Sequence, residues 1–426
     1  EEEREETAQE KKIRLAKQYI EQIKKEESEK LHDEEIDHDI IASRLRQETL
    51  ERTKQIYHER ANKLICPSSE LIKVLRGHQL SITCLVISPD DHFIYSASKD
   101  CSIIKWDVEN CKKIQTIPGG RKGTEKTHIG HTAHILSLAI TTDNKYLASG
   151  DKNNLVQIWD PSTFKHIKTF RGHRGPVSGL SFRKGSHQLF SASHDRSVKI
   201  WNLDEMSYVE TLFGHQDSIT DIDSLSRERA ITSGGRDSSV RIWKVVEESQ
   251  LVFNSNRGCV DCVSLIDESS FITGHDNNAL CLWNVTKKKP TFTRLGAHGE
   301  KKEGEKIITE ENWITSVSSL QYSDLIVSAG SKDGCIRFWK VGKDLRFLSL
   351  LFTLPIKGFV NSLKFSNNGK FLVAGIGQEH KLGRWWRLKE ARNSVCIIPL
   401  NYQDNQKQNG IKSDQTTETV PQSTTS

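Results

Sequence analysis

The stretch GHQDSITDIDSLSRERAITSGGRDSSVRIW, residues 214–243, contains a spaced set of residue types that recurs along the chain. Gly214-His215 opens the set, and Trp243 closes it 28 residues after the His. Asp237 lies six residues before the Trp, and Ser233 lies four residues before the Asp. The Gly-His pair and the Trp return at the same separation three more times, as Gly77-His78 with Trp106, Gly130-His131 with Trp159, and Gly172-His173 with Trp201. A set that returns about every 42 residues indicates a repeat architecture.

Repeats of this length and composition are typical of WD-type β-propellers, in which each repeat supplies four short antiparallel strands. We expect a hydrogen-bond relay inside each blade: the His contacts the Asp and the Ser, and the Ser contacts the indole N–H of the Trp. Such a relay is structural, because buried polar groups must be paired. In the second repeat Asn153 occupies the Asp position. The expected relay residues are His78, Ser96, Asp100 and Trp106; His131, Ser149 and Trp159; His173, Ser191, Asp195 and Trp201; and His215, Ser233, Asp237 and Trp243.

Two further repeats are altered but recognisable. The fifth ends at Trp283 and has Thr273 in the Ser position, and it has lost the Gly-His pair. The sixth keeps His298 and ends at Trp339, but Ala329 replaces the Ser. About 13 extra residues separate this His from its Trp, and we assign them to a charged loop over residues 299–311.

A seventh repeat spans residues 358–388, where we expect VNSLKF, FLVAGIG and GRWWRL to form three strands. The segment LIKVL, residues 71–75, precedes the first Gly-His pair. We expect it to supply the outer strand of the last blade and close the ring, which would remove free sheet edges. The sequence therefore predicts an all-β, seven-bladed propeller over residues 67–400.

The two flanks differ from the repeats. Residues 1–66 are rich in Glu, Lys and Arg, with apolar residues at helical spacing, and predict an α-helical arm that ends before Pro67. It is either a solvated or partly disordered helix, or an arm that docks on the propeller wall or on a partner. Residues 401–426 are polar and lack a hydrophobic pattern, so we expect a disordered tail. No apolar run approaches 18 residues and no secretory signal is visible, so no membrane partner is expected. Because the chain does not begin with Met, we expect it to be part of a longer one.

Catalysis, metal binding and cofactors are not expected. Nine scattered Cys, an odd number, fit a reducing compartment rather than a disulfide framework. Cys259 and Cys262 form a single C-x-x-C without a second pair of ligands, and we interpret them as buried structural thiols. The sequence has no P-loop and no Ser/His/Asp grouping outside the relay.

Charge points to a polyanionic partner. Residues 67–400 carry 45 basic and 35 acidic side chains. The residue before the relay Asp is cationic in several repeats, and basic residues lie nearby and in the last repeat. The alternative is that these exposed turn positions are basic by default. The RNA-binding candidates are Lys99, Lys152, Arg171, Arg174, His194, Arg196, Arg236, Lys332, Arg384, Arg387 and Arg392.

Several stretches resemble the WD-repeat proteins specific to the U3 small nucleolar ribonucleoprotein, including LRGHQLSITCLVISPDD and GQEHKLGRWWRLKEARNSVCIIPL. The resemblance covers most of residues 8–400. It implies a nucleolar protein that binds the box B/C stem of U3 small nucleolar RNA beside a small kink-turn-binding protein. It also implies assembly with other proteins of the small-subunit processome, for pre-rRNA processing in the nucleus.

Two other functions of WD propellers fit less well. Substrate receptors of ubiquitin ligases often carry Arg two residues after the Asp of the Trp-Asp pair. Here the two such pairs read WDVE and WDPS, from Trp106 and Trp159, which counts against that function. A chromatin reader would grip a cationic peptide in an acidic channel, and the basic turns argue against that as well.

Overall fold

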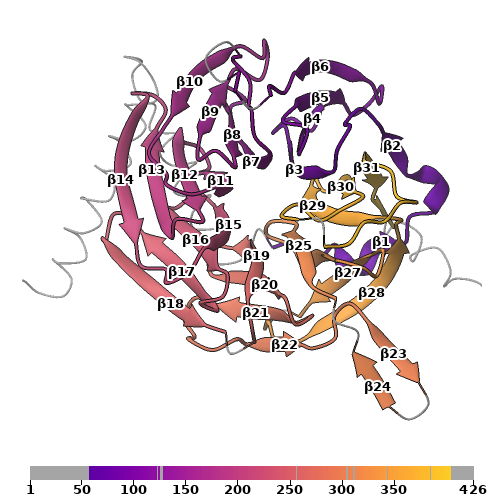
Figure 1. Cartoon of the computed structure of the whole chain (residues 1–426). Helices are drawn as coiled ribbons and strands as arrows, with labels where there is room; N and C mark the ends of the chain where they lie inside the picture. Colours follow the sequence, from indigo (N-terminus) through magenta and orange to yellow (C-terminus); the bar gives the residue numbers. More distant parts are fainter. Residues whose placement is uncertain are drawn as a thin grey trace, which may run out of the picture. The chain divides into compact units, whose positions relative to one another are not determined.

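The computed structural model describes residues 57–121, 123–124, 128–255, 257–303, 306–309, 312–342, 344–383 and 385–403. Within them, seven four-stranded antiparallel sheets follow one another around a ring (Figure 1). The expected helical arm and the expected tail fall almost entirely on residues outside this part of the chain.

Each blade is built from four strands, and the innermost comes first in six of the seven blades. Blade 1 contains β3 (Ile82–Ile87), β4 (Phe93–Ser98), β5 (Ile103–Asp107) and β6 (Lys113–Ile117). Blade 2 contains β7 (Ile135–Ile140), β8 (Leu147–Asp151), β9 (Val156–Trp159) and β10 (His166–Phe170). Blade 3 contains β11 (Val177–Phe182), β12 (Gln188–Ser193), β13 (Ser197–Asn202) and β14 (Ser207–Phe213). Blade 4 contains β15 (Ile219–Ser224), β16 (Arg229–Gly234), β17 (Ser239–Lys244) and β18 (Ser249–Asn254).

The remaining blades are less regular. Blade 5 contains β19 (Val260–Asp267), β20 (Ser270–His275), β21 (Leu280–Asn284) and β22 (Phe292–Arg294). Blade 6 contains β25 (Ile314–Ser319), β26 (Leu325–Gly330), β27 (Cys335–Val341) and β28 (Leu348–Pro355). Between them the expected charged loop contains a hairpin, β23 (Glu300–Glu303) with β24 (Lys306–Thr309), which projects from the ring (Figure 1).

Blade 7 joins the two ends of the propeller. It contains β29 (Phe359–Phe365), β30 (Phe371–Gly377), β31 (Ser394–Pro399) and, as its outer strand, β2 (Lys73–Leu75). The pairing of Val74 with Cys396 closes the ring as expected. The third strand was assigned wrongly: GRWWRL is not a strand but part of a long loop, residues 378–393. The apolar run in β31 fits a buried strand, whereas Trp385 and Trp386 are exposed.

The propeller begins before residue 67. Ala61 is buried in the apolar cluster of blades 6 and 7, and its backbone N–H donates to Asp324 Oδ1 at 3.0 Å. Strand β1 (Leu64–Ile65) pairs with β32 (Asn401–Tyr402), so residues near both ends of the repeats lie together. Two short 3-10 turns, η1 (Ala61–Lys63) and η2 (Ser69–Leu71), flank β1. No helix among the described residues is long and apolar enough to cross a membrane.

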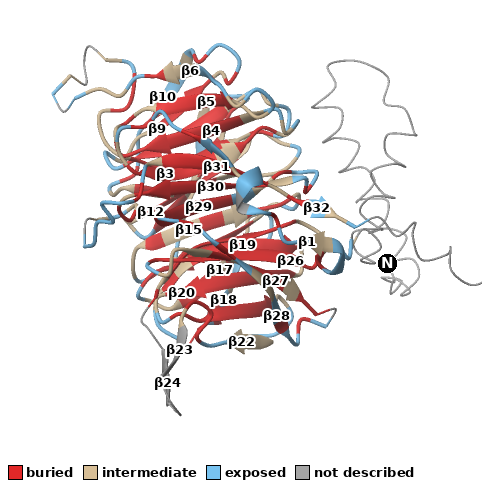
Figure 2. Ribbon diagram, turned by 90° about the vertical axis from the view of Figure 1, so that its right-hand side faces the viewer, coloured by how far each residue is buried: buried red, intermediate tan, exposed pale blue. Residues whose placement is uncertain are grey.

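The core consists of the layers between neighbouring blades, where both faces of each sheet are covered (Figure 2). Between blades 1 and 2, for example, Tyr95 and Ile103 pack with Ile135 and Leu147. Such two-sided burial explains the apolar runs in second strands such as β26 and β30.

Side-chain hydrogen bonds also join the inner strands of neighbouring blades. Thr83 Oγ1 donates to the carbonyl of Ile135 at 2.6 Å, and the equivalent residue does the same in four other blades. These bonds run from Ser178 to Ile219, from Thr220 to Val260, from Thr315 to Val360, and from Asn361 to Ile82. Leu136 and Asp261 occupy the position in blades 2 and 5.

Candidate nucleic-acid interface

The relay fixes one face of the propeller. In blade 3, His173 Nε2 lies 2.7 Å from Ser191 Oγ, which accepts the indole N–H of Trp201 at 2.8 Å. His173 Nδ1 lies 3.0 Å from Asp195 Oδ2. Burial alone would raise the pKa of Asp195, but hydrogen bonds from His173, Ser197 and the Arg174 backbone hold that pKa well below its usual range. The relay therefore ties each Gly-His loop to the turn between the second and third strands of its blade.

Blade 1 has the same arrangement. Ser96 Oγ accepts the indole N–H of Trp106 at 2.7 Å and lies 2.8 Å from His78 Nε2. His78 Nδ1 lies 3.3 Å from Asp100 Oδ2.

The relay differs from the expectation in blades 4 and 6. In blade 4 the indole of Trp243 donates to Thr232 at 2.8 Å, not to Ser233. Thr232 pairs with Arg241, two residues before the Trp, just as Ser96 pairs with a residue two before its Trp. The turn between the second and third strands has one more residue than in blade 1. The relay hydroxyl therefore lies one residue further from the Asp along the sequence, five residues before Asp237 instead of four. Blade 6 has the same longer turn. Its relay hydroxyl belongs to Ser328, and Ala329 is not part of the relay.

Two other blades use substitutes. In blade 2, His131 Nδ1 contacts the fully buried Asp151 at 2.9 Å, and the exposed Asn153 does not take the Asp role. In blade 5, His275 on β20 contacts Thr273 at 3.0 Å in place of a Gly-His histidine, and Trp283 donates to the same Thr at 2.9 Å. Spacing alone could not reveal either substitute.

We call the face formed by the Gly-His loops and the turns between second and third strands the Gly-His face, and the opposite one the return face. The exposed RNA-binding candidates of blades 2, 3, 4 and 6 all lie on the Gly-His face. His194 is half-buried there, and burial followed by the charge of Lys381 lowers its pKa. The exposed candidates are Lys152, Arg171, Arg174, Arg196, Arg236 and Lys332.

Lys99 is wrong as a phosphate-binding candidate. Its Nζ lies 3.0 Å from Glu379 Oε1, and both side chains are only 6% exposed. The basic residue that follows β4 of blade 1 thus pairs with an acidic residue in the loop after β30 of blade 7. Burial of this ion pair could not be read from the spacing of the repeats.

The arginines of the two faces differ in how their charge is balanced. On the return face Arg183 pairs with Glu228, Arg227 with Glu268, and Arg229 with Glu247. Arg346, also on the return face, has no such partner among the described residues. The Gly-His face has more arginines without one: besides Arg76, Arg121 and Arg257, five in loops and turns of blades 3, 4 and 7 have no side-chain hydrogen bond or carboxylate partner among the described residues. These five are Arg171, Arg174, Arg196, Arg236 and Arg392.

The loop over residues 378–393 lies on the Gly-His face and is fastened at both ends. Gln378 N–H donates to Asn393 Oδ1 at 3.0 Å, and Glu379 N–H donates to Ser81 Oγ at 3.1 Å. Arg387 donates to Gln378 Oε1 at 3.0 Å, and both Arg387 and Arg392 are exposed. Arg384 lies outside the described residues.

The same loop carries an aromatic cluster that the repeat pattern does not predict. Trp385 and Trp386, 59% and 40% exposed, lie with ring centroids 5.5 and 5.4 Å from that of Trp313. Lys332 Nζ stands 3.6 Å from the Trp386 ring centroid. The assignment of GRWWRL to a strand concealed this cluster. Exposed indoles beside cations are suited to stacking on nucleobases.

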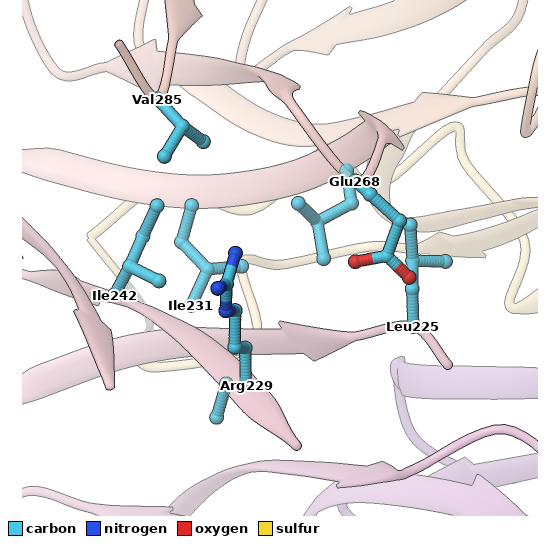
Figure 3. A pocket seen from close by; sticks show the side chains of 8 residues that line it. Leu225, Arg229, Ile231, Ile242, Glu268 and Val285 are labelled. Carbon is cyan, nitrogen blue, oxygen red and sulfur yellow. The ribbon is translucent and has the colours of Figure 1, made fainter. Parts of the chain in front are cut away.

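The described residues also include a small hollow and buried thiols. A hollow of about 20 Å³ between blades 4 and 5 is lined by apolar residues such as Ile231 and Val285, with Arg229 and Glu268 at its rim (Figure 3). That volume is on the scale of one water molecule. Among the described residues no group of His, Cys, Asp and Glu could hold a metal ion. Cys262 is buried, and burial raises its thiol pKa well above the usual range.

The repeats, the blades and the relay define a WD-repeat propeller. The sequence profile described as "WD domain, G-beta repeat" matches residues 69–107, 123–160, 164–202, 206–244 and 304–340. The chain is 54% identical to human U3 small nucleolar RNA-interacting protein 2 over 396 residues, which cover 93% of this chain and 83% of that protein. The chain belongs to the family of that protein.

A more distant relative and two solved structures also match this chain. The chain is 28% identical to Ribosomal RNA-processing protein 9 of Saccharomyces cerevisiae over 505 aligned positions, covering 90% of this chain and 88% of that protein. A solved structure described as "Structure of U3-55K" superimposes with a TM-score of 0.75 at 53% identity, covering 78% of this chain and all of the other. One described as "Crystal structure of RRP9 WD40 repeats" gives the same score and identity with 80% of this chain covered.

Proposed function

We propose that the chain is a non-catalytic RNA-binding component of the U3 small nucleolar ribonucleoprotein, acting in pre-rRNA processing in the nucleolus. It binds the box B/C stem of the U3 RNA through its Gly-His face, beside a small kink-turn-binding protein and other small-subunit processome proteins. The names of its relatives support the particle and the process. The single observation that carries the RNA contact is the contrast between the mostly ion-paired arginines of the return face and the more numerous unpaired arginines of the Gly-His face.

Uncompensated guanidinium groups favour a phosphate backbone. Arginine binds phosphate with two parallel hydrogen bonds, and a rigid loop holds the guanidinium without losing much entropy on binding. Such contacts position an RNA helix but carry no base sequence. A-form helices hide their bases in a deep major groove, so recognition of a particular stem needs unpaired bases.

The loop over residues 378–393 supplies surfaces for those bases. Trp385 and Trp386 are exposed, with Lys332 over one face of the Trp386 ring, and Arg387 and Arg392 lie in the same loop. Anchoring of the loop by Gln378 and Glu379 keeps this surface in place before RNA arrives. Pre-ordered aromatic surfaces avoid an entropic penalty on binding.

The test is a binding titration of the purified chain with the U3 box B/C stem and with a perfect duplex of the same length and composition. We expect tighter binding to the U3 stem, and Trp385→Ala with Trp386→Ala should remove the preference while leaving duplex binding intact. Equal binding of the unaltered chain to both RNAs would contradict recognition of the stem. No binding to either would contradict RNA binding altogether and favour a protein-only scaffold.

A further inference from the structure

Blade 3 differs from the other blades on the Gly-His face. In the four repeats with an intact Gly-His pair, three rim positions can be compared: the residue before Gly, the residue after His, and the residue after the Asp position. Blade 3 has arginine at all three, namely Arg171, Arg174 and Arg196. The other repeats have Arg76, Gln79 and Cys101 in blade 1; Ile129, Thr132 and Asn154 in blade 2; and Phe213, Gln216 and Ser238 in blade 4.

One carboxylate ties the loop that carries Arg171 and Arg174 to the turn that carries Arg196. Asp195 Oδ2 accepts the backbone N–H of Arg174 at 2.8 Å, and its Oδ1 accepts the N–H of Ser197 at 3.0 Å. Arg196 lies between these two anchor points, next to Asp195, and its own N–H donates to the Ser193 carbonyl at 3.2 Å. Loop and turn are therefore fixed relative to one another before any ligand binds.

Arg196 also occupies a strained position. Its φ is +69°, in the left-handed region, and the equivalent residue of the other three repeats is left-handed as well. Asn and Gly tolerate this conformation best, and blade 2 has Asn154 there. The turn conformation therefore gives no reason for an arginine at this position, and its exposed guanidinium has no partner among the described residues.

We propose that Arg171, Arg174 and Arg196 form the main phosphate-binding clamp of the propeller, which holds the backbone of a helical RNA segment separately from the aromatic loop of blade 7. This inference rests on the proposed RNA-binding function and specifies which residues hold the RNA phosphates. Three guanidinium groups on two tethered segments can engage neighbouring phosphates, each by paired N–H groups. Lys152 and Arg236 flank the clamp on blades 2 and 4.

The neighbouring repeats supply substitutions that this fold already accommodates. The triple variant Arg171→Gln, Arg174→Gln and Arg196→Asn places residues of blades 1, 2 and 4 at two of the three positions. Arg196→Asn relieves the left-handed strain, so lost binding cannot be attributed to a damaged turn. The matched control is Arg227→Gln, Arg229→Gln and Arg346→Gln on the return face, which removes the same charge.

Binding of each full-length variant to the U3 box B/C stem is measured from 50 to 300 mM salt. The clamp variant should bind about tenfold more weakly near physiological salt, and its plot of log affinity against log salt should flatten by about 2, because each lost phosphate contact contributes about 0.7–0.9. The control should behave like the unaltered chain, and thermal unfolding should show both variants folded. If the clamp variant matches the control while the unaltered chain binds the stem, the clamp is wrong and the proposed function stands. If the unaltered chain does not bind the stem, the proposed function itself fails.

Discussion

Lys99 and Glu379 form a buried ion pair, 3.0 Å long, that joins the first and last blades of the propeller. Lys99 follows β4 of blade 1 and Glu379 follows β30 of blade 7, and the Glu379 backbone N–H donates to Ser81 Oγ at 3.1 Å. The ion pair therefore links closure of the ring to the base of the loop that carries the exposed tryptophans.

Removing one member of this pair should destabilise the propeller. Lys99→Met removes the buried ammonium group that faces the Glu379 carboxylate, and breaking a buried ion pair from one side typically costs about 3–5 kcal/mol. Urea unfolding measures the loss. The double variant Lys99→Met with Glu379→Leu should regain most of it, because both charges are gone. A single variant as stable as the unaltered chain would contradict the burial of this pair.

The relay of blade 4 gives a second prediction. Thr232→Ala leaves the buried indole N–H of Trp243 without its acceptor and should destabilise the protein by about 1–3 kcal/mol. Ser233→Ala should have a smaller effect, because the Thr220 hydroxyl keeps its bond to the Val260 carbonyl at 2.7 Å. Chemical denaturation of both variants checks the order, and a larger effect at Ser233 would contradict the assignment.

This blade also shows how far the sequence predicts the fold. Fixed offsets between His, Asp and Trp predict the blades, because each offset reflects a strand register. The same offsets fail at Thr232 and Ser328, since one added turn residue moves the hydroxyl without moving the Asp or the Trp. They also fail at the loop over residues 378–393 and at Lys99. There the structure depends on contacts between blades 1 and 7, which no pattern within a repeat records.

Acid should weaken the blade 4 relay. Burial would raise the pKa of Asp237, but hydrogen bonds from His215 and Ser239 and the His215 charge lower it to about 2 from an ordinary 3.8. A carboxylate with a lowered folded-state pKa stabilises the protein above its unfolded pKa and loses that contribution as pH falls through the folded value. Unfolding measured from about pH 5 to pH 2 should show this loss in the unaltered chain. Asp237→Asn should be less stable at neutral pH and should lack this part of the pH dependence.

Ionisation of Asp261 should have the opposite effect on the stability of the protein. Burial and then the charge of Asp276 raise its pKa to about 7, against the attraction of Lys381. A raised carboxyl pKa means that stability falls as pH rises from about 4 to about 7. In five other blades the equivalent residue donates a hydrogen bond to the next inner strand.

Asp261→Thr should therefore be more stable than the unaltered chain at pH 8 and should lose the decline between pH 4 and 7. The control is Leu136→Thr, at the equivalent position of blade 2. It adds a hydroxyl donor to the inner strand without removing a carboxyl group. If Asp261→Thr retains the full decline, Asp261 is not the titrating group.

The central claim, that the Gly-His face binds RNA, is tested most directly by ultraviolet crosslinking of the purified full chain to the U3 box B/C stem. Crosslinked peptides are then identified by mass spectrometry. We expect crosslinks at Trp385 or Trp386 and in peptides containing Arg174 and Arg196, all on the Gly-His face. Crosslinks confined to the return face, for example at the exposed lysines Lys287 to Lys289, would contradict the account.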